Sequence, residues 1–203
     1  RSEMKTLKTV EQERILPQLS GAALLSAFYT NELLLKLTHR DDPHENLFEA
    51  YSEALQAMAA RIKAEVGAVD IFVSNAGVPT SGMGYAKFLE SRPEDWERFV
   101  QLNLYGLMNG CHVLLPDMLA RGWGRIVAIT SESWRAGVPM GIAAYAASKA
   151  GVVGFVRQLA AETGRKGITV NALSLGTMNN WEGSDEVARK SAFVPRAGSP
   201  ADV

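Results

Sequence analysis

Residues 69–77 have the sequence VDIFVSNAG, and they are the clearest guide to the fold. The run 69–74 is short, apolar and β-branched without polar alternation, which is typical of a parallel strand covered on both faces. Asn75, Ala76 and Gly77 follow directly, and such small residues let the backbone come close to a ligand. The stretch therefore predicts a buried strand that ends in a ligand-binding turn.

The same strand pattern recurs twice further along the chain, at residues 125–130 (RIVAIT) and 167–174 (GITVNALS). Apolar residues at helical spacing predict helices before each of these strands, over 93–120 and 144–163. Strand–helix–strand alternation at this spacing indicates βαβ units and an open parallel sheet. We therefore expect an α/β fold, a Rossmann-like doubly wound parallel sheet with three layers (α/β/α).

A helix is also predicted upstream of residue 69. Asp42-Pro43-His44-Glu45 is a good helix start signal, and apolar residues then recur on one face to about Val66, where Gly67 ends the helix. Residues 1–41 have weaker patterns: a polar helix over 1–19 and a possible strand over 33–38. We treat residues 1–203 as a single domain in which 1–41 have no firm assignment.

Composition excludes several classes of protein. Of the 203 residues, 47% are apolar, so the chain can bury a core and is not a disordered protein. The formal net charge of −1 provides no general attraction for nucleic acid. No apolar run approaches the roughly 18 residues of a membrane span, and the single cysteine excludes an internal disulfide. We expect a cytoplasmic protein without nucleic-acid or membrane partners.

A metal site is not expected either. Cys111 and His112 are adjacent on a predicted helix, so their side chains point about 100° apart and do not easily share an ion. His39 and His44 have no histidine or cysteine at ligand spacing. Cys111 is interpreted as a small core residue.

The strongest chemical signal is Tyr145-Ala-Ala-Ser-Lys149. Positions i and i+4 share a helix face, so the phenol and the ammonium are neighbours. A nearby cation is expected to lower the pKa of Tyr145 from its usual value of about 10 towards the working range of an acid–base catalyst. An isolated pair of this kind is common in helices without function, so the other residues at the same edge of the sheet decide the interpretation.

Two further residues support that interpretation. Ser131 ends the strand before Tyr145, and the carboxyl ends of parallel strands are where such sheets bind ligands. Ser133 is the alternative to Ser131. Asn103 lies in a helix whose neighbours face a core, so its amide needs hydrogen-bond partners.

This ordered set of residues resembles the short-chain dehydrogenase/reductase family. The resemblance covers about residues 42–203, and the spacing of its five blocks together is highly specific. The blocks are Asp70 with Asn75-Ala76-Gly77, Asn103, residues 125–131, Tyr145-x-x-x-Lys149 with Ala150-Gly151, and residues 167–171.

The resemblance implies an NAD(P)-dependent oxidoreductase that interconverts an alcohol and a ketone or aldehyde by hydride transfer. Tyr145 is then the general acid or base, Ser131 hydrogen-bonds the same substrate oxygen, and Lys149 holds the nicotinamide ribose. Asn103 orders a water that relays protons through Lys149. The implied cofactor contacts are those of Asn75, Ala76, Gly77, Tyr145, Lys149, Gly176 and Met178.

The sequence departs from the family at both ends. The family's glycine-rich T-G-x-x-x-G-x-G signature is absent, and by the family's spacing it belongs at or before Arg1. The family also continues beyond Val203 through another helix and strand. We therefore expect a sheet that is incomplete at both ends, and the sequence leaves NAD and NADP both open.

Large apolar residues follow the second and third strands and indicate a hydrophobic or ring-containing substrate. The predicted substrate-binding residues are Ser131, Trp134, Met140, Tyr145 and Trp181. The family also implies a homo-oligomer, a dimer or tetramer, paired through helices 94–120 and 144–163. Two alternatives remain: a non-catalytic sensor or scaffold with the same fold, and an enzyme similar to halohydrin dehalogenases, which have arginine where this chain has Lys149.

Overall fold

The computed structural model describes residues 45–65, 67–78, 83–192 and 194–202, and the expectations for residues 1–41 lie outside these ranges. The described part begins with helix α2 (Glu45–Glu65) and strand β1 (Ile71–Ser74). The elements that follow are η2 (Phe88–Glu90), α3 (Pro93–Phe99), η3 (Val100–Tyr105), α4 (Gly106–Arg121), β2 (Gly124–Ser131), α5 (Ser133–Ala136), α6 (Ala143–Thr163), η4 (Gly164–Lys166), β3 (Ile168–Leu175), α7 (Ser184–Ser191) and η5 (Pro200–Asp202).

The three described strands form one parallel sheet in the order β1–β2–β3. Ser74 is paired with Ala128, and Ser131 is paired with Leu175. The Glu132 N–H also donates to the Leu175 carbonyl at 2.9 Å, which joins the ends of β2 and β3. The predicted strands are confirmed, and their carboxyl ends meet at one edge of the sheet.

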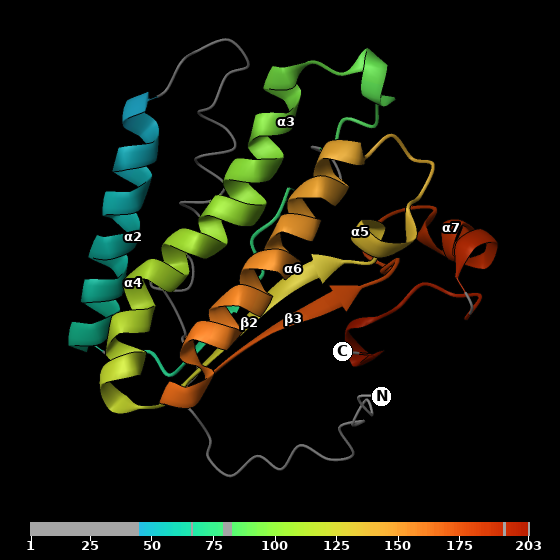
Figure 1. Ribbon diagram of the computed structural model, residues 1–203. Helices are drawn as coiled ribbons and strands as arrows, with labels where there is room; N and C mark the ends of the chain where they lie inside the picture. Colours follow the sequence, from blue (N-terminus) through green and yellow to red (C-terminus); the bar gives the residue numbers. More distant parts are fainter. Residues whose placement is uncertain (1–44, 66, 79–82, 193, 203) are drawn as a thin grey trace. The chain divides into compact units, whose positions relative to one another are not determined.

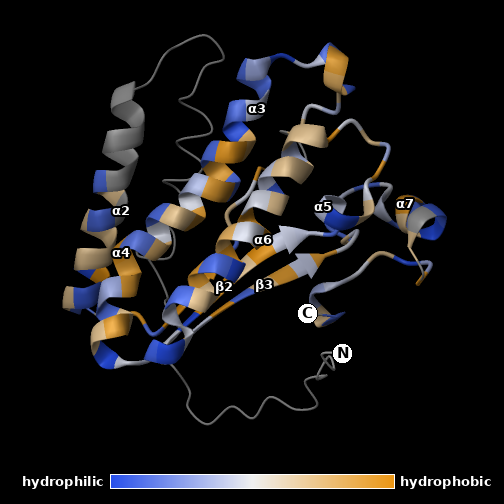
Figure 2. Cartoon of the chain, viewed as in Figure 1, coloured by the Kyte–Doolittle hydropathy of each residue, from blue (hydrophilic) through white to orange (hydrophobic). Residues whose placement is uncertain are grey.

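Helices α4 and α6 pack against the sheet, and α2 packs beside α4 (Figure 1). Figure 2 shows hydrophobic residues on α4 and α6 beside the strands and hydrophilic residues at the lower ends of these helices. The most buried side chains of this core come from both helices and from β2 and β3: Leu107, Cys111, Met118, Ile126, Val152 and Ile168. Removing this apolar area from water is what holds the helices on the sheet.

The burial of β1 differs from the prediction. Phe72 packs against the core, but Ile71 and Val73 are exposed. The described helices supply a layer on one side of the strand, so alternate residues of β1 face away from that layer. Within the described residues, the prediction of a strand covered on both faces is therefore wrong for β1.

The predicted helix 93–120 is continuous but contains a change of geometry. Its start is favourable because Pro93 occupies the first turn and the Asp95 carboxylate accepts a hydrogen bond from the Arg92 N–H at 3.1 Å. Residues Val100–Tyr105 are π-helical, and the Gly106 N–H bonds to the Gln101 carbonyl. Such π segments are often found at functional sites, and this one contains the buried Asn103.

Truncation of Leu107 tests this packing. Leu107 is 1% exposed, so Leu107→Ala is expected to lower the free energy of unfolding by about 2–5 kcal/mol through lost contacts and a cavity. Met108, the next residue on α4, is 38% exposed, and Met108→Ala should cost about 0.5 kcal/mol or less. Chemical denaturation measures both values, and equal losses for the two variants would contradict the described core.

Candidate active site

The end of β2 is tied to the start of α6. The Thr130 hydroxyl donates to the Lys149 carbonyl at 3.2 Å, and Lys149 Nζ donates to the Ile129 carbonyl at 2.9 Å. The side chain of Ser131, the last residue of β2, lies near the Tyr145 phenol of α6 and acts to lower its pKa. The structure thus brings together the serine, tyrosine and lysine that the sequence indicated.

Lys149 is a buried cation. The residue is 5% exposed, and its ammonium lies 5.9 Å from the centroid of the Tyr145 ring. Burial lowers the pKa of Lys149 to about 8, because removal from water disfavours the charged form. An ammonium has three donor hydrogens, so the carbonyl of Ile129 leaves capacity for further acceptors.

Tyr145 departs from the sequence-based expectation. Burial raises the pKa of its phenol above the usual value, a hydrogen bond with Ser131 lowers it, and the nearby Tyr85 raises it. The expectation that Lys149 lowers this pKa is therefore not met in the structure, because loss of hydration has the larger effect. The phenol keeps its proton at neutral pH.

Asn103 joins the same group of residues from η3. It is 3% exposed, and its Nδ2 donates to the Ser148 hydroxyl at 2.9 Å. Its Oδ1 is buried without a hydrogen-bond partner. A Cβ built on Gly77 would lie 3.4 Å from Asn103 Oδ1 and 3.7 Å from Lys149 Nζ, so the turn after β1 passes over both groups.

A second apolar cluster surrounds Tyr145, with Val78, Met83 and Phe99 buried in it. The Phe99 and Tyr145 rings meet edge to face with centroids 6.0 Å apart. The turn before α6 closes this cluster: the Ala86 N–H donates to the Gly141 carbonyl at 3.2 Å, and a Cβ on Gly141 would lie 2.7 Å from the Ala86 oxygen. Only glycine fits there, and this contact fixes the start of the helix that carries Tyr145.

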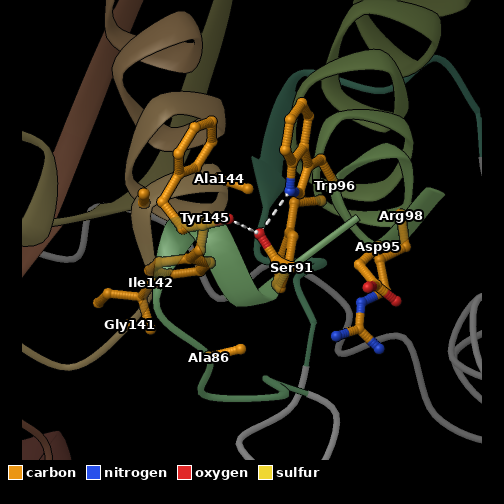
Figure 3. Close-up of a pocket in the computed structure, with 12 residues that line it drawn as sticks. Ala86, Ser91, Asp95, Trp96, Arg98, Gly141, Ile142, Ala144 and Tyr145 are labelled. Atoms are coloured by element: carbon orange, nitrogen blue, oxygen red, sulfur yellow. Dashed lines mark hydrogen bonds between the residues drawn. The ribbon is translucent and has the colours of Figure 1, made fainter. Parts of the chain in front are cut away.

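A small pocket lies between α3 and the start of α6 (Figure 3). Trp96 donates to Ser91 Oγ at 2.9 Å across its wall, and Tyr145 lines it from α6. Its free volume of about 20 Å³ is enough for roughly one water molecule. The pocket is too small to be the binding site of an organic substrate.

The predicted cofactor residues lie at the ends of β1 and β3. Asn75, Ala76 and Gly77 follow β1, with Asn75 exposed. Gly176 is exposed just beyond β3, and the backbone of Met178 pairs with Gly198. The unpartnered Asn103 Oδ1, the spare hydrogens of Lys149 and the absence of a side chain at Gly77 fit a ligand with hydroxyl groups, such as the ribose of a nicotinamide nucleotide.

The predicted substrate residues come from three separate segments. Trp134 lies in α5, which packs against α6; Met140 lies in the turn before α6; and Trp181 lies in the turn before α7. Ser133, the alternative to Ser131, is buried and its hydroxyl has no hydrogen-bond partner. The grouping of Trp134, Met140 and Trp181 around a substrate remains a prediction. Of the two serines, the structure associates Ser131, rather than Ser133, with Tyr145.

The described residues offer neither a membrane-spanning helix nor a cluster of metal ligands. No described helix is both long enough and apolar enough to cross a membrane. Within the same ranges, no group of three or more histidine, cysteine, aspartate or glutamate side chains is arranged to hold a metal ion.

Sequence reasoning missed two features of the site. Ser148 was regarded only as part of the Tyr145–Lys149 spacing, although its hydroxyl bonds to Asn103 from 45 positions away. Tyr85, which influences the pKa of Tyr145, carries no motif. For Ser148, the signal that could have been used was a serine one position before the lysine, on a helix otherwise rich in alanine.

Comparisons with known proteins agree with this geometry. A family model described as short chain dehydrogenase matches residues 49–189. A second model, described as Recombination protein O C terminal, matches residues 18–70 and overlaps the first only over residues 49–70, which include most of α2 and end just before β1. Its match lies mostly outside the described residues.

Several curated proteins are similar to the chain. Nodulation protein G of Azospirillum brasilense is 43% identical over 61% of this chain and 48% of its own length. Acetoacetyl-CoA reductase of Shinella zoogloeoides is 40% identical over 61% of this chain and 49% of its own length. Oxidoreductase UcpA of Salmonella typhimurium is 37% identical over 68% of this chain and 51% of its own length. The chain thus spans about half the length of the curated relatives it matches.

A solved structure confirms the fold. The gluconate 5-dehydrogenase from Burkholderia cenocepacia, in complex with NADP and tartrate, is 29% identical and superposes with a TM-score of 0.65 over 73% of this chain and 59% of its own. The parallel sheet with its flanking helices is therefore Rossmann-like, as the sequence predicted. Together with the family model, which spans more than half of the sequence, this likeness establishes that the chain belongs to the short-chain dehydrogenase family.

Proposed function

We propose that the protein is an NAD(P)-dependent oxidoreductase that interconverts an alcohol and a ketone or aldehyde. The observation that carries this proposal is that the hydroxyl groups of Ser131 and Tyr145 lie near each other, next to the buried Lys149 and at the carboxyl edge of a parallel sheet. In this position both hydroxyl groups can form hydrogen bonds with the same substrate oxygen. The curated relatives named as a reductase and an oxidoreductase support the same class of reaction.

Tyr145 is the proposed general acid in reduction and the general base in oxidation. Burial raises its pKa, so the phenol holds its proton at neutral pH and can donate it to a carbonyl oxygen. Ser131 hydrogen-bonds the same oxygen and polarises the carbonyl. A bound nicotinamide cofactor supplies or accepts the hydride.

Lys149 and Asn103 are proposed to act where the cofactor binds. The spare hydrogens of the Lys149 ammonium bind the ribose hydroxyls, and Asn103 orders a water beside it. The backbones of Asn75, Ala76, Gly77, Gly176 and Met178 complete the contacts to the dinucleotide. Both NAD and NADP remain candidates, and the solved relative holds NADP.

The proposed substrate is a hydrophobic or ring-containing alcohol or carbonyl compound. Trp134, Met140 and Trp181 supply the apolar surface, since all three are half-buried and belong to segments that follow β2 and β3. We place the protein in the cytoplasm because its single cysteine forms no internal disulfide. A homo-oligomer, paired through α4 and α6, completes the proposal.

Tyr145→Phe tests the proton donor. The variant keeps the ring that packs on Phe99 but removes the hydroxyl, so kcat for carbonyl reduction should fall by about 10²–10⁴-fold while NAD(P)H binding persists. Reduction is measured by NAD(P)H absorbance with β-ketoacyl thioesters, keto sugar acids and cyclic ketones, and binding by tryptophan quenching. Tyr105→Phe, at a surface tyrosine, is the matched control. Undiminished kcat in Tyr145→Phe contradicts the assignment, and a parent protein that binds neither nucleotide indicates the non-catalytic alternative.

The buried Lys149 predicts a specific dependence of stability on pH. Its pKa is about 8 in the folded protein against 10.5 for the free side chain, so the unfolded chain binds the proton more tightly between these values. Below pH 8 the folded protein bears the full free-energy cost of burying the Lys149 ammonium. This cost disappears as the pH rises to 10.5, because the buried amine loses its proton. The free energy of unfolding of the parent, relative to Lys149→Met, should therefore increase from pH 8 to 10.5. Denaturation at several pH values measures this difference; a constant or falling difference shows that the ammonium is hydrated.

A further inference from the structure

Ser148 occupies a central place in a chain of hydrogen bonds beneath the proposed site. It lies on α6 between Tyr145 and Lys149 and is 3% exposed. Its hydroxyl donates to the Tyr145 backbone carbonyl at 2.7 Å and accepts from Asn103 Nδ2 at 2.9 Å. One side chain therefore connects the helix of the tyrosine and lysine to the π segment that carries the asparagine.

The direction of these hydrogen bonds follows from the chemistry of a hydroxyl group. A serine hydroxyl has a single hydrogen, and here that hydrogen is used on the Tyr145 carbonyl. Towards Asn103 the hydroxyl can only accept, so it is the amide nitrogen, not the amide oxygen, that must face Ser148. The opposite amide orientation would set two acceptors against each other in a buried position, at the cost of an unsatisfied group.

The orientation of the amide decides what faces the lysine. With Nδ2 on Ser148, Asn103 Oδ1 faces the same space beside Gly77 as Lys149 Nζ, and Oδ1 has no hydrogen-bond partner. Groups near the ammonium include the Tyr145 ring from α6, the Ile129 carbonyl from β2 and Gly77 after β1. An acceptor stabilises the ammonium, whereas the NH2 end of a reversed amide would oppose it.

We propose that Ser148 is a positioning residue of the active site, because its hydroxyl turns the Asn103 amide so that the amide oxygen points to the space beside Gly77 that the Lys149 ammonium also faces. The Ser148 hydroxyl contacts neither the Tyr145 hydroxyl nor the Lys149 ammonium directly, and it acts through Asn103. The catalytic meaning of this arrangement rests on the proposed function, but the arrangement itself can be tested in the protein without substrate or cofactor.

The direct test is the reactivity of the Lys149 amine. An acylating reagent labels only the unprotonated amine, and peptide mass spectrometry follows the labelling rate at Lys149 against pH. Ser148→Ala releases the amide, so its oxygen is no longer held towards the space that the ammonium faces, and the labelling rate at pH 7 should rise about three- to tenfold. An unchanged labelling profile at Lys149 in Ser148→Ala would overturn the proposal.

Thr163 provides a matched control on the same helix. Its hydroxyl is buried and donates to the Leu159 carbonyl at 2.7 Å, like that of Ser148, but it lies at the far end of α6. Thr163→Val should lower the free energy of unfolding without altering the labelling of Lys149. If this variant changes the labelling as much as Ser148→Ala does, the effect is one of helix stability, and the positioning role is refuted.

A double-mutant cycle with Asn103→Leu shows whether Ser148 acts through Asn103. Leucine removes both ends of the amide, so adding Ser148→Ala to Asn103→Leu should have no further effect on the labelling rate. The same shift in both backgrounds would overturn the proposal. In the active enzyme, Ser148→Ala should lower kcat more than it changes KM and should shift the pH profile. Absence of activity in the parent would count against the proposed function only, since the labelling cycle does not depend on turnover.

Discussion

Much of the proposed active site depends on the burial of one ammonium group. Lys149 is held under the turn after β1, and its charge is compensated mainly by a backbone carbonyl of β2. A buried cation with unused donors is unfavourable by itself, so such a position indicates a partner that arrives from outside. The hydroxyl-rich half of a nicotinamide nucleotide is a partner of this kind, and the family of the chain supports it.

The fold explains how these groups meet. In the register of the sheet, Ser131 of β2 lies beyond the last residue that β2 pairs with β1. The hydrogen bonds of Lys149 with the Thr130 hydroxyl and the Ile129 carbonyl hold α6 against this end of β2. The π segment moves Asn103 into the same interior space. Tertiary contacts, rather than local sequence, therefore bring together residues as far apart in the sequence as Gly77 and Lys149.

The strands and the pairing of the proposed catalytic residues were predictable because they follow local rules. Short β-branched runs located β1, β2 and β3 to within two residues, and the i, i+4 rule paired Tyr145 with Lys149. Ser131 was preferred to Ser133 because it ends a strand, and the structure associates it with Tyr145.

Other features depend on packing and could not be predicted from one sequence. The raised pKa of Tyr145 results from burial, which the spacing of two side chains does not reveal. The change to π geometry at Val100–Tyr105 has no residue signature, and the contact of Gly77 with Asn103 and Lys149 joins three elements. The direction of the Ser148 hydrogen bonds required the positions of all its neighbours.

The most direct test of the proposed active site is a crystal structure of the protein with an oxidised nicotinamide nucleotide and an alcohol. The alcohol oxygen is expected about 2.6–3.2 Å from both the Ser131 and the Tyr145 hydroxyl groups, with the Lys149 ammonium in contact with the ribose. An alcohol bound away from that pair, or a nucleotide that leaves Lys149 without a contact, would contradict the proposed active site.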